Sequence, residues 1–259
     1  ATACTKTTNT SSAPGFTILT FSTVADCIWT VPTGVATVDL LVVGGGGGGG
    51  DSTTNATGGS GGAGGYFSAN NVSVTGDVAI GVGAGGTGAT ASNVQASNGS
   101  ASYFGSLIVG GGGGGNSYGY TTNQAAKAGE GGSDYVSGGN GGGGRALQGT
   151  NNSSITGGSA GSYASSGISF NGTSYTGCSG VAGSSGGGDY GSGGWGGSLN
   201  VSNRTSSISG ASVIYAKSGT YWPWGHASNT AGTQTYGSGG ATNYVYGATE
   251  VSPNTLGGS

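Results

Sequence analysis

The sequence is poor in charge, and this excludes two classes of partner. Lysine and arginine number five and aspartate and glutamate eight among 259 residues, so charged residues make up 5% of the chain against an average of ~25%. The net charge of −3 is scattered, and no basic cluster exists for the phosphates of nucleic acid or for anionic lipid. No apolar run approaches the ~20 residues that span a bilayer. We therefore expect no nucleic-acid partner and no insertion into a membrane.

Methionine is absent and cysteine is scarce. The chain starts at Ala1 and contains no methionine, which favours a mature exported product whose leader has been removed. In an oxidising compartment Cys4 and Cys27 would form a disulfide that ties the N-terminal arm to the first strands, and Cys178 would be left over. Isolated buried thiols are the alternative.

The residue patterns of catalysis and cofactor binding are also missing. The stretch GVGAGGTG, Gly81 to Gly88, fits the dinucleotide motif, but neither a helix nor an acidic residue at the required spacing follows. The only histidine, His226, has Asp189 and Glu250 as its nearest carboxylates in sequence, and one histidine with three distant cysteines does not make a zinc site. The segment GGGDYGSGG lacks the nine-residue period of calcium-binding repeats. We predict a non-enzymatic protein without catalytic residues, cofactor or metal.

Glycine dominates what remains, with 66 residues. Seven consecutive glycines, Gly44 to Gly50, follow the apolar run VDLLVV, and six more, Gly110 to Gly115, follow SLIV. Further blocks lie at Gly58–Gly65, Gly138–Arg145 and Gly186–Gly197. Residues without Cβ can stack closely as polyproline-II-like helices of three residues per turn, whose amides point outward to neighbouring segments. A linker would occur once, so the repetition favours glycine as packed structure, with a flexible linker as the alternative.

The remaining segments predict an all-β protein. Short runs rich in β-branched and aromatic residues alternate with turns, and only Asn123–Ala128 could form a helical turn. In the segment 72–82, five apolar residues fall on one face at period two. The predicted strands are residues 16–22, 28–32, 38–43, 72–82 and 106–109. We expect β-sandwich-like strands with packed polyglycine segments and long glycine-rich loops.

The chain divides at Pro14. Residues 1–14 are threonine-rich and predict an extended N-terminal arm, and residues 15–259 form one glycine-rich β domain, which could separate into a β-rich part, 15–115, and a loop part, 116–259. The arm could leave its own body and pair with an adjacent subunit, or fold back and be tied by the disulfide.

Residues 16–115 carry a specific combination of motifs. WTVPTG is followed by a strand ending in polyglycine, then by VGAGG, SYFG and a second polyglycine run. This pattern resembles the glycine-rich β domain of phage tail fibres and bacterial secreted or surface proteins, as does SISGASVIYAKSG at 207–219. The resemblance implies an extracellular, non-catalytic role. The apolar closing strand typical of such domains is missing, and Asn243–Tyr246 or another subunit would replace it.

Two functions follow from this resemblance. The chain is a structural subunit of a homopolymeric surface filament, pairing with copies of itself through the arm, or a receptor-binding adhesin at the tip of a phage tail fibre or on a cell surface. The aromatic cluster YWPWGH provides Tyr221, Trp222 and Trp224 as a platform for a surface glycan or receptor, or as a hydrophobic plug.

The sequence also contains nine N-x-S/T sequons, which are glycan sites if the source glycosylates and ordinary polar loops otherwise. They are Asn9, Asn55, Asn71, Asn98, Asn151, Asn152, Asn171, Asn200 and Asn203.

Overall fold

The computed structural model confirms the all-β class. It describes residues 2–50, 56–57, 59–91, 94–115, 146–147, 168–175 and 204–216, and these residues contain strands and no helix. No helix in this described part is long and apolar enough to cross a membrane. The predicted helical turn at 123–128, the glycine blocks at 138–145 and 186–197, the aromatic platform, Cys178, His226 and residues 243–246 lie outside it.

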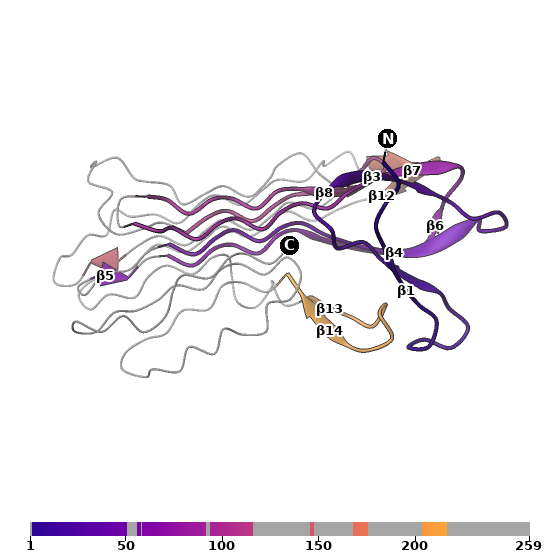
Figure 1. Ribbon diagram of the computed structural model, residues 1–259, viewed down its shortest axis with the longest axis horizontal. Helices are drawn as coiled ribbons and strands as arrows, with labels where there is room; N and C mark the ends of the chain where they lie inside the picture. Colours follow the sequence, from indigo (N-terminus) through magenta and orange to yellow (C-terminus); the bar gives the residue numbers. More distant parts are fainter. Residues whose placement is uncertain are drawn as a thin grey trace.

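A four-stranded sheet and a two-stranded sheet make up the body of the fold (Figure 1). The larger sheet has the order β3-β7-β8-β9 and the smaller pairs β4 with β6, all antiparallel. Four further hairpins or pairs are β1-β2, β5-β10, β11-β12 and β13-β14. The strands are β1 (Thr7–Asn9), β2 (Ile18–Thr20), β3 (Asp26–Thr30), β4 (Thr37–Val43), β5 (Ala56–Thr57), β6 (Tyr66–Ser73), β7 (Asp77–Gly81), β8 (Ser102–Phe104), β9 (Leu107–Val109), β10 (Ala146–Leu147), β11 (Ile168–Phe170), β12 (Thr173–Tyr175), β13 (Arg204–Ser206) and β14 (Val213–Tyr215).

One hydrophobic core lies between the two sheets. Its aromatic residues form a continuous chain: Trp29 contacts Phe104 at 6.1 Å between ring centroids, and Phe104 contacts Phe170 edge-on at 5.5 Å. The aliphatic members come from both sheets: Leu40, Val42, Val72, Val74, Val78, Ile80, Leu107 and Val109. The body is therefore a small β-sandwich held by the ordinary burial of apolar side chains.

The segment 72–82 shows where the period-two pattern succeeds and where it fails. Val72, Val74, Val78 and Ile80 are all buried, so the prediction of one apolar face is confirmed. The prediction of one continuous strand is wrong, because the chain turns at Gly76, whose φ is +64°, and passes from β6 in one sheet to β7 in the other. The inward alternation persists through the turn, since both sheets face the same core.

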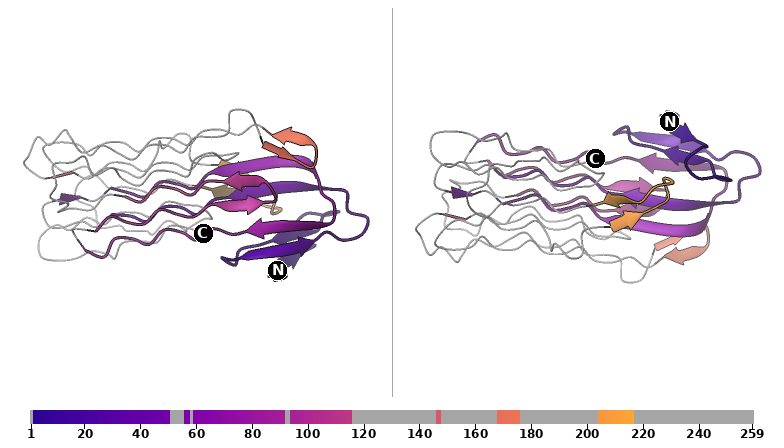
Figure 2. Two further views of the ribbon diagram at one scale, coloured as in Figure 1. Left: turned by 90° about the horizontal axis from the view of Figure 1, so that it is seen from above. Right: turned by 90° about the horizontal axis from the view of Figure 1, so that it is seen from below.

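The molecule is elongated, with the sandwich at one end. In Figure 1 the glycine segments leave the sandwich together and run side by side along the long axis, and the two further views in Figure 2 show the same arrangement. The short pair β5-β10 lies at the far end, away from the N-terminal strands (Figure 1). Sheet and glycine layers are thus two successive parts of one body.

Candidate functional site

Each glycine segment begins where a sandwich strand ends. The β4-β6 ladder ends on the pair Val43 and Tyr66, and the next contact is the amide of Gly44 donating to the carbonyl of Gly65 at 3.0 Å. The ladder then changes its repeat, with Gly47 donating to Gly62 at 2.8 Å and Gly50 to Gly59 at 2.9 Å. A three-residue step on both segments is the repeat of the polyproline-II helix. The sandwich therefore sets the register of the glycines that follow it.

The segment 44–50 is the centre of a bundle of five described segments, which we call the glycine bundle: 44–50, 59–65, 82–91, 94–101 and 110–115. It runs antiparallel to 59–65 and to 94–101, to which the Gly48 amide donates through Ser97 O at 3.0 Å. It runs parallel to 82–91 and to 110–115, whose Gly86 and Gly112 amides donate to its carbonyls at 2.8 Å each. Successive residues thus contact different neighbours, as expected for three residues per turn.

The interior of the glycine bundle has no room for a side chain. A Cβ built on Gly47 would lie inside 3.0 Å of the carbonyl of Gly113, and one on Gly48 would meet the carbonyl of Thr87 equally closely. The same holds across the bundle, at Gly44, Gly45, Gly61, Gly64, Gly83, Gly86, Gly99, Gly111, Gly112, Gly114 and Gly115. Because the obstructing atoms belong to backbone, no rotamer change relieves the overlap. The expectation that glycine serves as packed structure is confirmed for these segments.

Side chains in the glycine bundle are small where buried and polar where exposed. Ser60, Ala63, Ala89 and Ala96 are buried, each at 4% exposure or less. Thr87, Thr90, Ser97, Asn98 and Ser100 are exposed, and the hydroxyls of Thr87 and Ser97 are hydrogen-bonded at 2.9 Å. Asn98 takes part in the lattice itself, because its side-chain carbonyl accepts the Gly114 amide at 2.8 Å.

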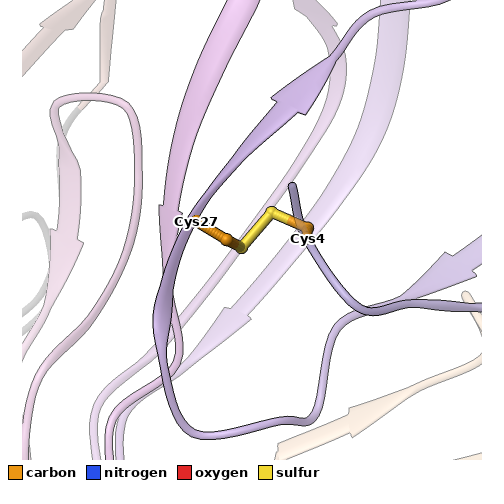
Figure 3. The surroundings of a disulfide bond; sticks show 2 residues. All are labelled: Cys4 and Cys27. Carbon is orange, nitrogen blue, oxygen red and sulfur yellow. A yellow bond between two sulfur atoms is a disulfide. The ribbon is translucent and has the colours of Figure 1, made fainter. Parts of the chain in front are cut away.

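The N-terminal arm lies on its own chain. Ala3 bridges to Ile28, the Cys4 amide donates to Ile28 O at 3.2 Å, and β1 pairs with β2. Cys4 and Cys27 are joined in a disulfide (Figure 3). Of the two arrangements that the sequence leaves open for the arm, this chain has the folded-back one, which covers the outer edge of β3 with residues 2–4.

Tyr103 bridges three strands at the point where the large sheet meets the glycine bundle. A Cβ on Gly81 of β7 would overlap the Tyr103 ring from β8, so the missing side chain lets the ring lie across that strand. The hydroxyl reaches the Asp26 carboxylate on β3. Burial raises the pKa of Tyr103, and the hydrogen bond and negative charge of Asp26 raise it further.

The four sequons in the described residues differ in the freedom of their amides. Asn171 sits at φ +46° in the β11-β12 turn and donates to Ser73 O at 2.8 Å, while Asn98 is bound to Gly114. Asn9 caps its own turn by accepting the amides of residues 11 and 12. Asn71 is exposed at φ +54°, and its backbone amide donates to Asp39 at the β4 bulge. Asn55, Asn151, Asn152, Asn200 and Asn203 lie outside the described residues.

The chemistry that this arrangement supports is mechanical. Within the described ranges no group of three or more histidine, cysteine or acidic residues is placed to hold a metal ion. Tyr221, Trp222 and Trp224 are outside those ranges, so the aromatic platform stays a prediction. Sequence reasoning missed the roles of Asn98 and Tyr103, because both depend on partners 16 and more residues away that no motif marks.

The comparisons with known proteins agree with this picture. Comparison with curated proteins gave no match. Residues 22–259 match a family described as the glycine-rich domain, which covers the sandwich, the glycine bundle and the rest of the chain to its last residue. The chain belongs to this glycine-rich domain family.

Proposed function

We propose that this chain is a non-enzymatic structural protein of the extracellular space, a subunit of a homopolymeric surface filament or fibre. The observation that carries the proposal is the interior of the glycine bundle, which consists of backbone packed on backbone. Such an interior has no space for a substrate, yet it joins five described segments by hydrogen bonds in several directions. Stiffness along the long axis is what a fibre subunit needs.

Two further features support an extracellular location. The Cys4–Cys27 disulfide suits an oxidising compartment, because thiols are kept reduced in most cytosols. The resemblance of residues 16–115 to domains of phage tail fibres and bacterial surface proteins points the same way. A virion tail is the viral counterpart of the same setting.

Polymerisation by arm exchange would reuse contacts that the single chain already makes. In the folded-back arm, residues 2–4 pair with β3 and Cys4 bonds to Cys27. If the arm of one subunit occupies this place on the next, the same contacts become intermolecular, as in domain swapping. The result is a head-to-tail chain whose links are covalent disulfides.

Two measurements on the purified full chain test this proposal. Negative-stain images should show filaments, and particles that stay single at every concentration would refute the filament. A non-reducing gel should show a ladder that dithiothreitol collapses, whereas filaments with single-chain bands would refute arm exchange. The matched control is Cys178→Ser, which removes the third cysteine and must leave the ladder unchanged.

A receptor-binding adhesin is the second candidate, favoured by the elongated form. The glycine bundle carries the β5-β10 pair far from the sandwich, which is how a tip is presented to a receptor (Figure 1). For this function, Trp222→Ala with Trp224→Ala should abolish attachment to host cells while leaving thermal stability unchanged. Attachment that survives with a lowered melting temperature would assign these tryptophans to a hydrophobic plug instead.

A further inference from the structure

One side of the glycine bundle faces solvent, and its composition differs from the interior. The segments 44–50, 59–65 and 110–115 are buried throughout. The segments 82–91 and 94–101 are buried on one row of residues and exposed on others. We call the exposed hydroxyl residues Thr87, Thr90, Ser97 and Ser100 the outer row.

A glycine lattice has no natural boundary. In a polyproline-II helix the backbone makes no internal hydrogen bonds, so amides point outward on all three faces. Inside the bundle these groups pair with neighbouring segments, as the Gly45 amide does with Ser100 O at 2.9 Å. A boundary segment made only of glycine would offer the same groups to a polyglycine segment of another molecule, as an unpaired edge strand does in a sheet.

The outer row removes this opportunity. At interior positions a Cβ would lie inside 3.0 Å of a neighbouring carbonyl, which shows how closely adjacent segments approach. On segment 94–101 the inward positions are Ala96 and Gly99, whereas Ser97 and Ser100 turn their Cβ atoms to the exposed side. We propose that the outer row closes the glycine bundle, so that a second copy of this chain cannot add its polyglycine segments side by side.

The outer row is also held in position. The hydroxyls of Thr87 and Ser97 are hydrogen-bonded across the two boundary segments at 2.9 Å, and the Ser97 amide donates to Thr87 O at 3.0 Å. These bonds fix the Cβ atoms where an added segment would lie. Thr87 is β-branched and has few alternative rotamers. Copies of this chain can then associate through their ends, while their sides remain separate.

The test replaces the outer row by glycine in the full chain. The variant Thr87→Gly/Ser97→Gly/Ser100→Gly should associate laterally, with about a doubling of mass per unit length when two bundles lie side by side. Small-angle X-ray scattering measures this as a concentration-dependent rise in the cross-sectional radius of gyration. End-to-end filaments lengthen the particle without widening it, so the result is independent of the proposed function.

The matched control is Thr87→Ala/Ser97→Ala/Ser100→Ala, which removes the hydroxyls and keeps every Cβ. It should keep the cross-section of the wild-type protein. A glycine variant with an unchanged cross-section, or an alanine variant that widens as much, would overturn the inference. If the triple glycine variant does not fold by circular dichroism, the pair Ser97→Gly and Ser97→Ala gives the same comparison with a smaller effect.

Discussion

Replacing Gly47 by alanine is the most direct test of the backbone packing in the glycine bundle. The new Cβ would lie inside 3.0 Å of the carbonyl of Gly113. That carbonyl already accepts the Gly62 amide at 2.7 Å, and Gly62 O accepts the Gly47 amide at 2.8 Å. Moving residue 113 away from the methyl group therefore strains two of the three segments that meet at this point.

The expected cost follows from two opposing terms. Overpacking a tight interior costs about 1–3 kcal/mol, and the upper part of that range applies because only backbone atoms surround the site. Alanine also restricts the unfolded chain, which offsets about 0.4–1 kcal/mol. The net loss in the free energy of unfolding is about 2 kcal/mol, which lowers the melting temperature by about 4–8 °C.

Thermal and urea unfolding followed by circular dichroism measure this loss. The matched control is Ser100→Ala, which places the same residue on the exposed side of the same bundle and should change stability by no more than about 0.5 kcal/mol. Gly47→Ala melting at or above the wild-type temperature would refute the packing argument, since the segments would then be far enough apart in solution to admit a methyl group.

Three further predictions concern the body of the fold. Cys27→Ser opens the link to Cys4 across a sequence separation of 23 residues and should cost about 3 kcal/mol, measured by urea unfolding with and without dithiothreitol. Stability should fall at alkaline pH, because a raised pKa means that the fold favours neutral Tyr103; the stabilisation is complete below the pKa of the unfolded chain and is lost as pH rises through the raised value. Tyr103→Phe should flatten that alkaline decline while losing about 1 kcal/mol near neutrality from the broken hydrogen bond, as melting at several pH values would show. Secreted from a glycosylating host, the protein should carry a glycan on Asn71 and little on Asn171, whose amide is already bound to Ser73 O, and peptide mass mapping distinguishes the two.

The fold class and the role of glycine are predictable from the sequence because each depends on local chemistry. Period-two apolar residues identify the core face of a strand without knowledge of its partner, as at Val78 and Ile80. Glycine runs repeated after strands favour packing because only a residue without Cβ allows such close approach. Both arguments need no long-range information.

The arrangement of the segments is not predictable in this way. Seven identical glycines contain no signal for register or partner, and their pairing is inherited from the strands that precede them, as Gly44 follows Val43. The break at Gly76 is hidden because the apolar alternation is the same on both sides of the turn. For the arm, β propensity predicts an extended conformation but does not identify which edge strand it meets.

The three-residue step of the glycine bundle makes its length adjustable in units. Because neighbouring segments contact one another every third residue, inserting one turn of three residues in each segment would restore every contact one turn farther out. The sandwich would be unaffected, and the tip would move outward by about 9 Å for each added turn. An insertion of one or two residues would instead rotate side-chain-bearing positions into the interior. Related chains can therefore differ in reach by discrete increments, like a ruler graduated in turns of the helix.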